Sequence, residues 1–382
     1  MSERAGKLVK NLSGEMTYYS FRPSALPPVP DIEIDSEMQQ LLIEAYRKIS
    51  FLEGLSSGIP NRDLFISMYV RKEALVSSQI EGTQCTIDDI FDPSIDENVN
   101  ANVSDVVNYV RAINFAVERM KGFPLCNRLI REIHAVLMKS VRGCDKTPGE
   151  FRKSQNWIGG AGSTLKNARY IPPNYKDMLK AMNDLERFIN REDGIDPIIK
   201  SALIHYQFES IHPFLDGNGR IGRLLITLFL IRENILSSPV LYLSCYLKAN
   251  RTEYYDRLSD IRINGTFEQW IKFFLRGIAE TAQDATAAID KLNALHAKNE
   301  DLLPNQKLKN FLTHLESNPI ITIPIAAECL QCSRNTMANY VKLMCSKGIL
   351  KPSSKTKKTV IYSYESYLNI LREGTTLFTN LY

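Results

Sequence analysis

One segment near the middle of the chain concentrates residue types that can do chemistry. It runs from His212 to Arg223 and reads HPFLDGNGRIGR. Helical periodicity precedes and follows it, so we expect a turn between two helices, with its glycines just before the second helix. A Gly-Asn-Gly turn permits positive φ and leaves amide N–H groups accessible, and a helix N-terminus adds about half a positive charge. The segment therefore predicts an anion cradle suited to phosphate.

Charged side chains surround this cradle. Arg220 and Arg223 are three residues apart and share a helical face, where forked bonds to phosphate oxygens are expected. Asp216 offers a carboxylate for Mg²⁺, which usually takes one or two carboxylates plus substrate phosphates. His212 lies on the entry side and can accept a proton from an incoming hydroxyl. Together these residues predict nucleotidyl or phosphoryl transfer.

Two other interpretations of the same letters fit less well. Residues 217–222 match the dinucleotide fingerprint G-x-G-x-x-G. That fingerprint requires a preceding strand within a βαβ unit, whereas a helical pattern and a His-Pro pair precede the glycines here. A glycine turn with merely solvated arginines would suit a lone Gly-x-Gly, but not a pattern that also specifies His, Asp, Asn and two Arg.

The elements that must position this turn are predicted to be mostly α-helical. Apolar residues recur at three- and four-residue spacing from about residue 36, and again at 63–80, 103–120, 126–140, 175–190, 197–211, 219–233 and 267–295. The exception is 143–174, where glycines and prolines separate short apolar segments and predict a β-hairpin flap between two helices. The first 35 residues become proline-rich, so we expect them to run extended over the surface.

The pattern changes after residue 301. Helices are predicted at 307–316, 324–330 and 333–347, and strands at 349–351 and 359–362. Three helices followed by a two-stranded ribbon are typical of a winged helix-turn-helix. We therefore expect a mostly α fold in three domains: an N-terminal helical region (1–100), a helical catalytic domain (101–295) and a C-terminal winged-helix domain (301–382).

Composition and charge narrow the class of protein. The net charge of +4 is uneven, because residues 301–382 hold ten Lys and Arg against five Asp and Glu, so a small basic module follows a near-neutral body. The chain has no apolar run near the roughly 20 residues of a membrane helix, and it begins with no apolar secretory segment. Its seven cysteines are scattered and do not form a disulfide framework. We expect a cytoplasmic protein with reduced thiols and no membrane partner.

The segment 212–223 resembles the signature of the Fic (filamentation induced by cAMP) family, H-P-F-x-[DE]-G-N-G-R-x-x-R, at every specified position. Residues 130–134, 148–152 and 170–173 resemble the helix, loop and flap that accompany it in the family, so the resemblance extends from about residue 20 to 295. It implies a mostly helical nucleotidyltransferase that moves AMP from ATP to a Ser, Thr or Tyr hydroxyl of a target protein, itself included.

The resemblance also implies roles for the residues of the motif. His212 would deprotonate the target hydroxyl, and Asp216 would bind Mg²⁺ bridging the α- and β-phosphates. Arg220 would contact the β-phosphate and Arg223 the γ-phosphate. The amides that would hold the α-phosphate are those around Gly217, Asn218 and Gly219. Tyr254 and Tyr255 resemble an aromatic pair beside the adenine, although packing on a helix face would explain them equally well.

A second motif lies upstream, at residues 77–82, which read SSQIEG. It resembles the family's inhibitory helix, [ST]-x-x-x-E-[GN], with Ser77, Glu81 and Gly82 at the specified positions. A glutamate that pairs with Arg223 would occupy the place of the γ-phosphate. Gly82 is a natural helix stop. The motif therefore predicts autoinhibition. The alternative is that Glu81 is an ordinary surface glutamate at a helix end.

The flap and the C-terminal module predict the partners. Asn167, Ala168, Arg169 and Tyr170 are expected to pair with an extended segment of the target by strand addition. In the C-terminal module, Arg334, Asn335 and Thr336 open the expected recognition helix, and lysines 355, 357 and 358 lie in the wing. That pattern is typical of DNA binding. Winged helices also dock proteins or form homodimers, so DNA binding and protein contact both stay open.

Alternative functions also stay open at this point. Glu81 could position a water, which would suit removal of AMP, and the same cradle could transfer another phosphate-linked group. A different class is a DNA-binding transcriptional regulator whose Fic-like domain only senses nucleotide. The leading interpretation is an Mg²⁺-dependent protein adenylyltransferase that is inhibited by its own Glu81.

Overall fold

The computed structural model describes residues 1–12, 14, 17–57, 62–93, 95, 100–139, 145–160, 162–355 and 360–377. Within them the body is helical, as predicted. Its helices are α1 (Ser36–Ser57), α2 (Arg62–Ile80), α3 (Ile87–Phe91), α4 (Ala101–Met120), α5 (Asn127–Leu137), α6 (Tyr175–Asn190), α7 (Pro197–Ile211), α8 (Asn218–Arg232), α9 (Ser244–Ala249), α10 (Arg251–Asn264) and α11 (Phe267–Glu300). None of the helices in these ranges is long and apolar enough to cross a bilayer.

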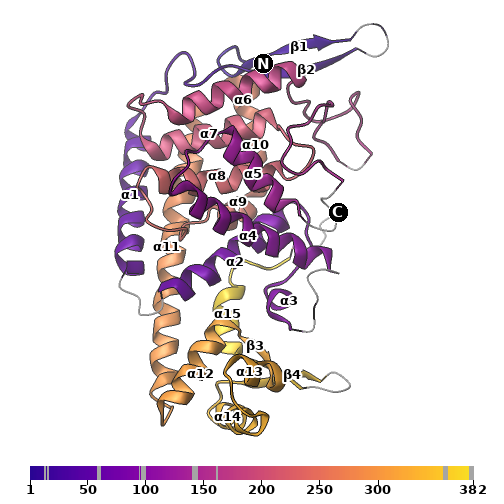
Figure 1. The fold of residues 1–382 in the computed structure, drawn as a ribbon. Coiled ribbons are helices and arrows are strands. Elements are labelled where there is room, and N and C mark those ends of the chain that lie inside the picture. The colour runs from indigo at the N-terminus through magenta and orange to yellow at the C-terminus, as the bar shows by residue number, and fades with distance from the viewer. Residues whose placement is uncertain are drawn as a thin grey trace.

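Helices α7 and α8 form the centre of the body and pack against each other (Figure 1). Residues 198–211 of α7 and 218–230 of α8 are all buried, so each helix is covered on every side. Local sequence fixes where α7 starts. The Asp196 side chain accepts hydrogen bonds from the amides of Ile198 and Ile199, and Pro197 stands in the first turn. The turn between these two helices is therefore held by the most buried elements of the molecule.

Other helices surround this central pair. Helix α11 is 34 residues long, packs along α1, and runs from the body down to the C-terminal module (Figure 1). Helices α4 and α5 pack together, and α2 lies against α4, α8 and α9. The end of α2 is thus placed beside α8, the helix that starts within the segment 212–223.

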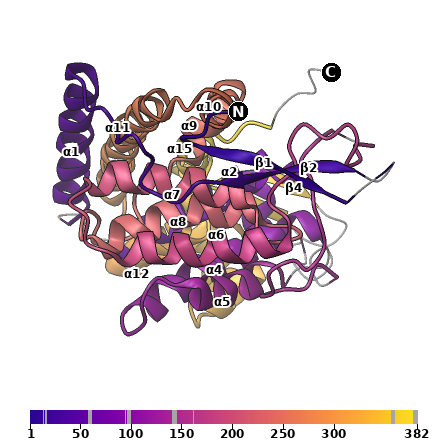
Figure 2. The same ribbon diagram turned by 90° about the horizontal axis from the view of Figure 1, so that it is seen from above.

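The N-terminal residues form a β-hairpin that the sequence pattern did not predict. Strands β1 (Gly6–Asn11) and β2 (Tyr18–Pro23) pair antiparallel, and the hairpin lies over α6 and α7 (Figure 2). The amide of Phe21 donates to the carbonyl of Ile171 at 2.9 Å. The hairpin therefore supports the chain that follows the flap. The proline-rich residues 24–30 after β2 form neither helix nor strand.

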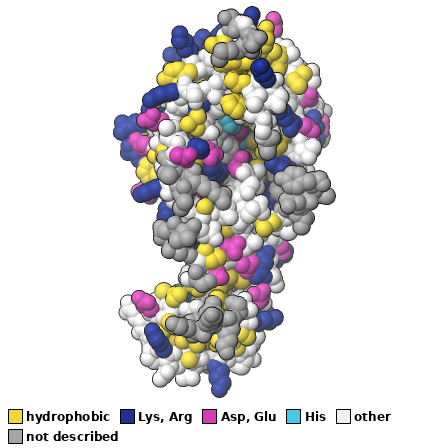
Figure 3. Space-filling view, turned by 90° about the vertical axis from the view of Figure 1, so that its right-hand side faces the viewer, with side chains coloured by type: hydrophobic (Ala, Val, Ile, Leu, Met, Phe, Trp, Pro, Cys, Tyr) yellow, Lys and Arg dark blue, Asp and Glu magenta, His cyan; other side chains and the backbone are white. Residues whose placement is uncertain are grey.

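The C-terminal module is a separate lobe joined to the body at a narrower waist (Figure 3). Its elements are α12 (Gln306–Ser317), β3 (Ile320–Thr322), α13 (Ile323–Cys329), α14 (Arg334–Ser346), β4 (Lys351–Lys355), β5 (Val360–Ser363) and α15 (Glu365–Arg372). The three predicted helices are present, and β4 and β5 pair antiparallel within a sheet of order β3-β5-β4. Strand β3 and helix α15 were not predicted, and Lys357 and Lys358 lie outside the described residues.

Candidate active site

The turn between α7 and α8 is fixed by two residues in left-handed conformations. His212 ends α7 with φ 50° and ψ 60°, and Gly217 precedes α8 with φ 78°. Arg152, which is 1% exposed, donates from Nε to the His212 carbonyl at 3.0 Å and from Nη2 to the Pro173 carbonyl at 2.6 Å. Asn156 donates to the same His212 carbonyl at 3.2 Å. The backbone of His212 is therefore held by two side chains that precede the flap, and Arg152 also bonds the chain that follows it.

The His212 side chain is suited to accept a proton. It is half-buried, and burial lowers its pKa to about 4, so the imidazole is neutral near pH 7. Its Nδ1 atom has no hydrogen-bond partner among the described residues. A neutral imidazole at the open end of the turn is the form that a general base requires.

Asn218 and His134 complete the support of the turn. The Asn218 side chain accepts the Phe214 amide at 2.8 Å and donates to the Phe214 carbonyl at 2.9 Å. His134 accepts the Gly149 amide on Nδ1 at 2.9 Å, so its Nε2 must carry the proton that bonds the Asp216 carbonyl at 3.0 Å. His134 and Arg152 were not among the predicted site residues, although the segments that carry them resembled the family's flanking motifs.

The two arginines of the motif occupy different surroundings. Arg223 is 3% exposed and donates to the Ser77 hydroxyl at 2.8 Å, the Ser77 carbonyl at 2.9 Å and the Glu81 carboxylate at 2.7 Å. Arg220 lies 3.6 Å from Asp216 and 3.9 Å from Asp105. Strong, short bonds therefore occupy Arg223, whereas the contacts of Arg220 are long.

Glu81 lies directly over the first turn of α8. A Cβ atom on Gly219 would come within 2.1 Å of a Glu81 carboxylate oxygen, so the carboxylate approaches this closely only because residue 219 is glycine. Burial raises the pKa of Glu81 and the Arg223 guanidinium lowers it, with a net shift downward. Gly82 follows with φ +94°, and α2 ends there as predicted. Glu81 is therefore held as an anion where a helix N-terminus attracts negative charge.

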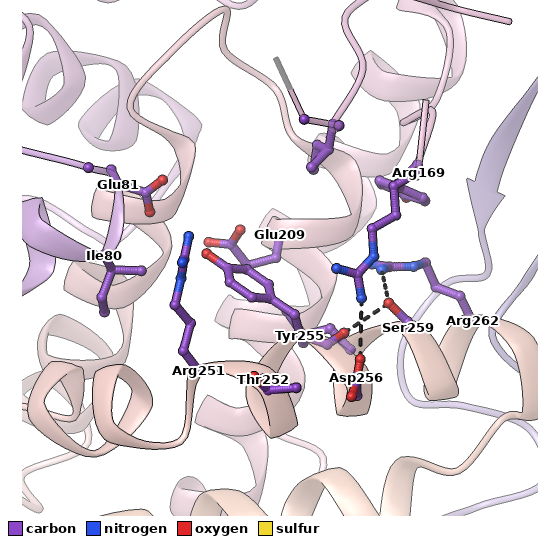
Figure 4. Close-up of a pocket in the computed structure, with 16 residues that line it drawn as sticks. Ile80, Glu81, Arg169, Glu209, Arg251, Thr252, Tyr255, Asp256, Ser259 and Arg262 are labelled. Carbon is purple, nitrogen blue, oxygen red and sulfur yellow. Dashed lines mark hydrogen bonds and ion pairs between the residues drawn. The ribbon is translucent and has the colours of Figure 1, made fainter. Parts of the chain in front are cut away.

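A cavity of about 590 Å³ opens beside this ion pair (Figure 4). The end of α2, the flap, α7 and α10 contribute its walls, and Glu81, Glu209 and Tyr255 reach it from different helices or their ends. Glu209 is 9% exposed, one of its oxygens has no hydrogen-bond partner among the described residues, and burial raises its pKa to about 7. Sequence reasoning did not single out Glu209, because its only signal is that it lies one helical turn before His212.

The two tyrosines of the predicted adenine pair are placed differently. Tyr255 is half-buried and lines the cavity. Tyr254 is 1% exposed, and its hydroxyl bonds His205 Nε2 at 2.9 Å, while His205 Nδ1 bonds the Gly222 carbonyl at 2.9 Å. Tyr254 thus ties α10 to α8 through His205, and Tyr255 is the member of the pair that a ligand in the cavity can reach.

The flap forms one wall of the cavity through residues 158–160, 169 and 170. Ile158 and Tyr170 form an isolated antiparallel bridge, with N···O distances of 2.8 and 3.0 Å. Tyr170 is buried and donates to the Ser210 carbonyl at 2.6 Å, which fixes the base of the flap to the end of α7. Arg169 and Asn167 are exposed, and Ala168 is half-buried. Main-chain groups of the flap tip therefore lie near solvent, beside the cavity.

The residues present fit a magnesium ion only together with a substrate. The Asp216 side chain is about half exposed, and one of its oxygens accepts the Gly217 amide at 2.5 Å. Within the described ranges no three His, Cys, Asp or Glu side chains are grouped so that they could hold a metal ion. A single carboxylate next to a phosphate cradle is the donor set that Mg²⁺ uses when substrate phosphates supply further ligands.

Comparisons with known proteins agree with this geometry. Residues 39–118 match the Fic/DOC family N-terminal model, and residues 124–230 match the Fic/DOC family model. Protein adenylyltransferase Fic from Drosophila erecta is 34% identical over 146 residues, which are 38% of this chain and 26% of the relative. The protein of the same name from Aedes aegypti is 33% identical over 146 residues and covers the same shares. The chain thus spans about a quarter of the length of these curated relatives.

Solved structures share the fold. The crystal structure of a Fic family protein from Desulfovibrio desulfuricans G20 superposes with a TM-score of 0.58 and 18% identity, covering 87% of this chain and 97% of that chain. At this identity the likeness concerns the fold alone.

Proposed function

We propose that this chain, which belongs to the Fic/DOC family over residues 39–118 and 124–230, is a protein adenylyltransferase that moves AMP from ATP to a hydroxyl of a target protein. The observation that carries the proposal is the α7–α8 turn. It places a neutral imidazole, a helix N-terminus without a side-chain cap and two arginines close together. The relatives named protein adenylyltransferase support the same reaction.

The proposed chemistry assigns one step to each group. His212 takes the proton from the target hydroxyl, whose oxygen then attacks the α-phosphorus of ATP. The bond from the α-phosphorus to the bridging oxygen breaks, and pyrophosphate leaves with the electron pair. The amides of Gly217, Asn218 and Gly219 stabilise the charge that develops on the α-phosphate. Arg220 and Arg223 hold the outer phosphates by charge-assisted bonds.

Asp216 is the residue that would hold Mg²⁺, together with oxygens of the substrate. The ion would neutralise charge on the phosphates when bound. Tyr255 would contact the base in the cavity, whereas Tyr254 would act through His205 on the packing of α8 and α10.

We propose that Glu81 inhibits this reaction in the state described here. Its 2.7 Å bond occupies the Arg223 group that would otherwise hold the γ-phosphate, and Ser77 holds the same guanidinium. ATP that enters the site must either displace this carboxylate or bind with its phosphates misplaced. Gly82 lets the chain turn away immediately after Glu81.

We propose that the target binds as a strand added to residues 167–170 of the flap. The main-chain groups there would set the target hydroxyl near His212 with little demand on target sequence. We retain the predicted division into an N-terminal region (1–100), a catalytic domain (101–295) and a C-terminal winged-helix domain (301–382). Helix α4 lies at the first of these boundaries and packs against both α2 and α5.

The test of this function is labelling with α-³²P-ATP and Mg²⁺. Wild type, Glu81→Gly and Glu81→Gly with His212→Ala are compared on the purified chain and on added protein. We expect strong labelling of protein by the single variant and none by the double variant. Absence of label in all three, with ATP still bound in a calorimetric titration, would contradict the proposal and favour a nucleotide-sensing role.

For the C-terminal module we propose contact with DNA through the first turn of α14. Arg334 and Asn335 are exposed there, and the Ser333 side chain caps the helix by accepting the Thr336 amide at 3.1 Å. Fluorescence anisotropy with a 30-base-pair duplex should show binding that weakens as salt rises from 50 to 200 mM, and less binding by Arg334→Ala. Absence of binding at the lowest salt would favour docking of a protein or of a second copy instead.

A further inference from the structure

The inhibitory segment, which we define as residues 77–89, is contacted on two sides. Its front meets Arg223 through Ser77 and Glu81. Its rear meets the C-terminal segment, which we define as residues 365–376 and which consists of α15 and the residues after it. These two segments are nearly 300 residues apart in the sequence, so the rear contacts are a property of the fold and not of local structure.

Gln79 makes the first rear contact. Its side chain is 3% exposed and donates to the Cys85 carbonyl at 2.8 Å and the Thr375 carbonyl at 3.0 Å. Its oxygen accepts from Lys248 at 2.6 Å, and Lys248 also donates to the Thr376 carbonyl. Because residues two apart point to nearly opposite sides of a helix, Gln79 is buried on the far side from Glu81.

Asp88 and Arg372 make the second rear contact. Both guanidinium nitrogens of the fork bond the carboxylate, with Nε to Oδ2 at 3.0 Å and Nη2 to Oδ1 at 2.5 Å. Glu365, within the same helix α15, also accepts from Arg372 at 2.8 Å. The side chains of Arg372 and Asp88 are 32% and 40% exposed, so this pair is partly shielded from solvent and more favourable than a fully exposed one.

We propose that the C-terminal segment is part of the inhibitory device and holds Glu81 against Arg223 from behind. This inference rests on the proposed AMP transfer. Gln79 and Asp88 fix the two ends of the turn that carries Glu81, so loss of either contact allows the turn to move away from α8. Helix α15 begins directly after β5 and Tyr364, so a partner that moves the sheet of the C-terminal module also moves Arg372. By linkage, ATP that displaces Glu81 weakens the same contacts.

A charge exchange tests the Asp88–Arg372 contact. Arg372→Glu and Asp88→Arg are each compared with the variant that carries both changes, in the labelling assay with α-³²P-ATP and Mg²⁺. We expect each single change to raise the initial rate at least about threefold, and the exchanged pair to return it to within about twofold of wild type. Lys309→Glu is the matched control, because Lys309 pairs with Glu300 at similar exposure but does not touch residues 77–89.

Hydrogen exchange gives a second measurement that needs no catalysis. We expect faster exchange of amides 77–89 in both single variants and wild-type exchange in the exchanged pair and in Lys309→Glu. Wild-type rates and wild-type exchange in both single variants would overturn the inference, even where Glu81→Gly is strongly activated. If hydrogen exchange changes but no variant, including Glu81→Gly, labels protein, the proposed AMP transfer is rejected. The contact of the C-terminal segment with residues 77–89 is then kept. A rise that persists in the exchanged pair would also overturn the role of this contact.

Discussion

The phosphate cradle, residues 212–219, and the flap are built in opposite ways. The cradle is the turn between two helices that are buried on all sides, and its backbone carbonyls at His212, Phe214 and Asp216 each bond a side chain. The flap is joined by a single bridge between Ile158 and Tyr170, and its tip is exposed. The base of the flap is tied to the core at Tyr170, and the exposed Arg169 pairs with Asp256 of α10.

This difference matches the parts of the reaction that each region would serve. In the proposed reaction the triphosphate would be the same in every turnover. A turn that is already ordered would bind it with little further loss of conformational entropy. A target protein varies in sequence, so a flap that offers main-chain groups accepts many extended segments. Under the proposed function, the buried turn would meet the constant ligand and the exposed flap tip would meet the variable one.

The largest expected effect lies in the cradle. In the Glu81→Gly background, His212→Ala should lower AMP transfer about 10²- to 10⁴-fold, because general base catalysis contributes that range. ATP affinity, measured by calorimetry, should stay within about threefold, since the imidazole contacts the hydroxyl and not the phosphates. A loss of transfer under tenfold would show that another group accepts the proton.

The buried support of the cradle predicts a dependence of stability on pH. Burial lowers the pKa of His205 to about 4, against about 6.5 in an unfolded chain. Between these values the unfolded state binds more protons, so stability is fully present above pH 6.5 and is lost as pH falls toward 4. Relative to His205→Gln, wild type should lose up to about 3 kcal/mol of unfolding free energy across this window, or roughly 10²-fold in the unfolding equilibrium.

Urea unfolding of wild type and His205→Gln at pH 7, 6, 5 and 4.5 measures this difference. Buried Glu73 and Glu209, whose pKa values burial raises to about 7, act in the opposite direction. They are present in both proteins and cancel in the comparison. Parallel stability curves for the two proteins would contradict the assignment of His205 as a neutral buried imidazole.

The contrast between cradle and flap also explains what the sequence could predict. The turn and the order of the helices around it follow from short-range pattern, because the motif letters set the helix ends. The pairing of Glu81 with Arg223 joins distant segments, and it was predicted only through the family resemblance. The β1–β2 hairpin was missed, because its residues carry no regular alternation and it is stabilised by contacts to α6, α7 and residue 171.

Long-range partners account for the remaining gaps. Glu209 gives little sequence signal, because its close approach to Gly222 joins two different helices. Tyr254 and Tyr255 look equivalent in the sequence, and only the packing of His205 separates the buried one from the one that lines the cavity. Contacts of Arg372 with Asp88 join segments about 280 residues apart, which no local pattern can predict.

Changes in the flap are expected to lower labelling of protein by a smaller factor and to leave ATP affinity unchanged. Replacement of residues 167–169 by glycine in the Glu81→Gly background should lower labelling of protein about tenfold, because a looser tip loses more backbone entropy when a target strand pairs with it. Tyr170 is kept, since it holds the end of α7. ATP affinity should not change. A parallel loss of ATP binding would show that the flap shapes the cradle as well.

The smallest expected effect concerns the ion pair at the flap tip. Arg169 and Asp256 lie 3.2 Å apart with side chains 61% and 64% exposed, so Arg169→Ala should change the free energy of unfolding by less than about 0.5 kcal/mol. The forked and more buried pair of Arg4 with Glu268 is the control, and Arg4→Ala should cost more, about 1 to 3 kcal/mol. Urea unfolding at pH 7 compares the two. A loss above 1 kcal/mol for Arg169→Ala would mean that this pair closes the flap over the cavity, and the flap would then belong with the rigid part of the site.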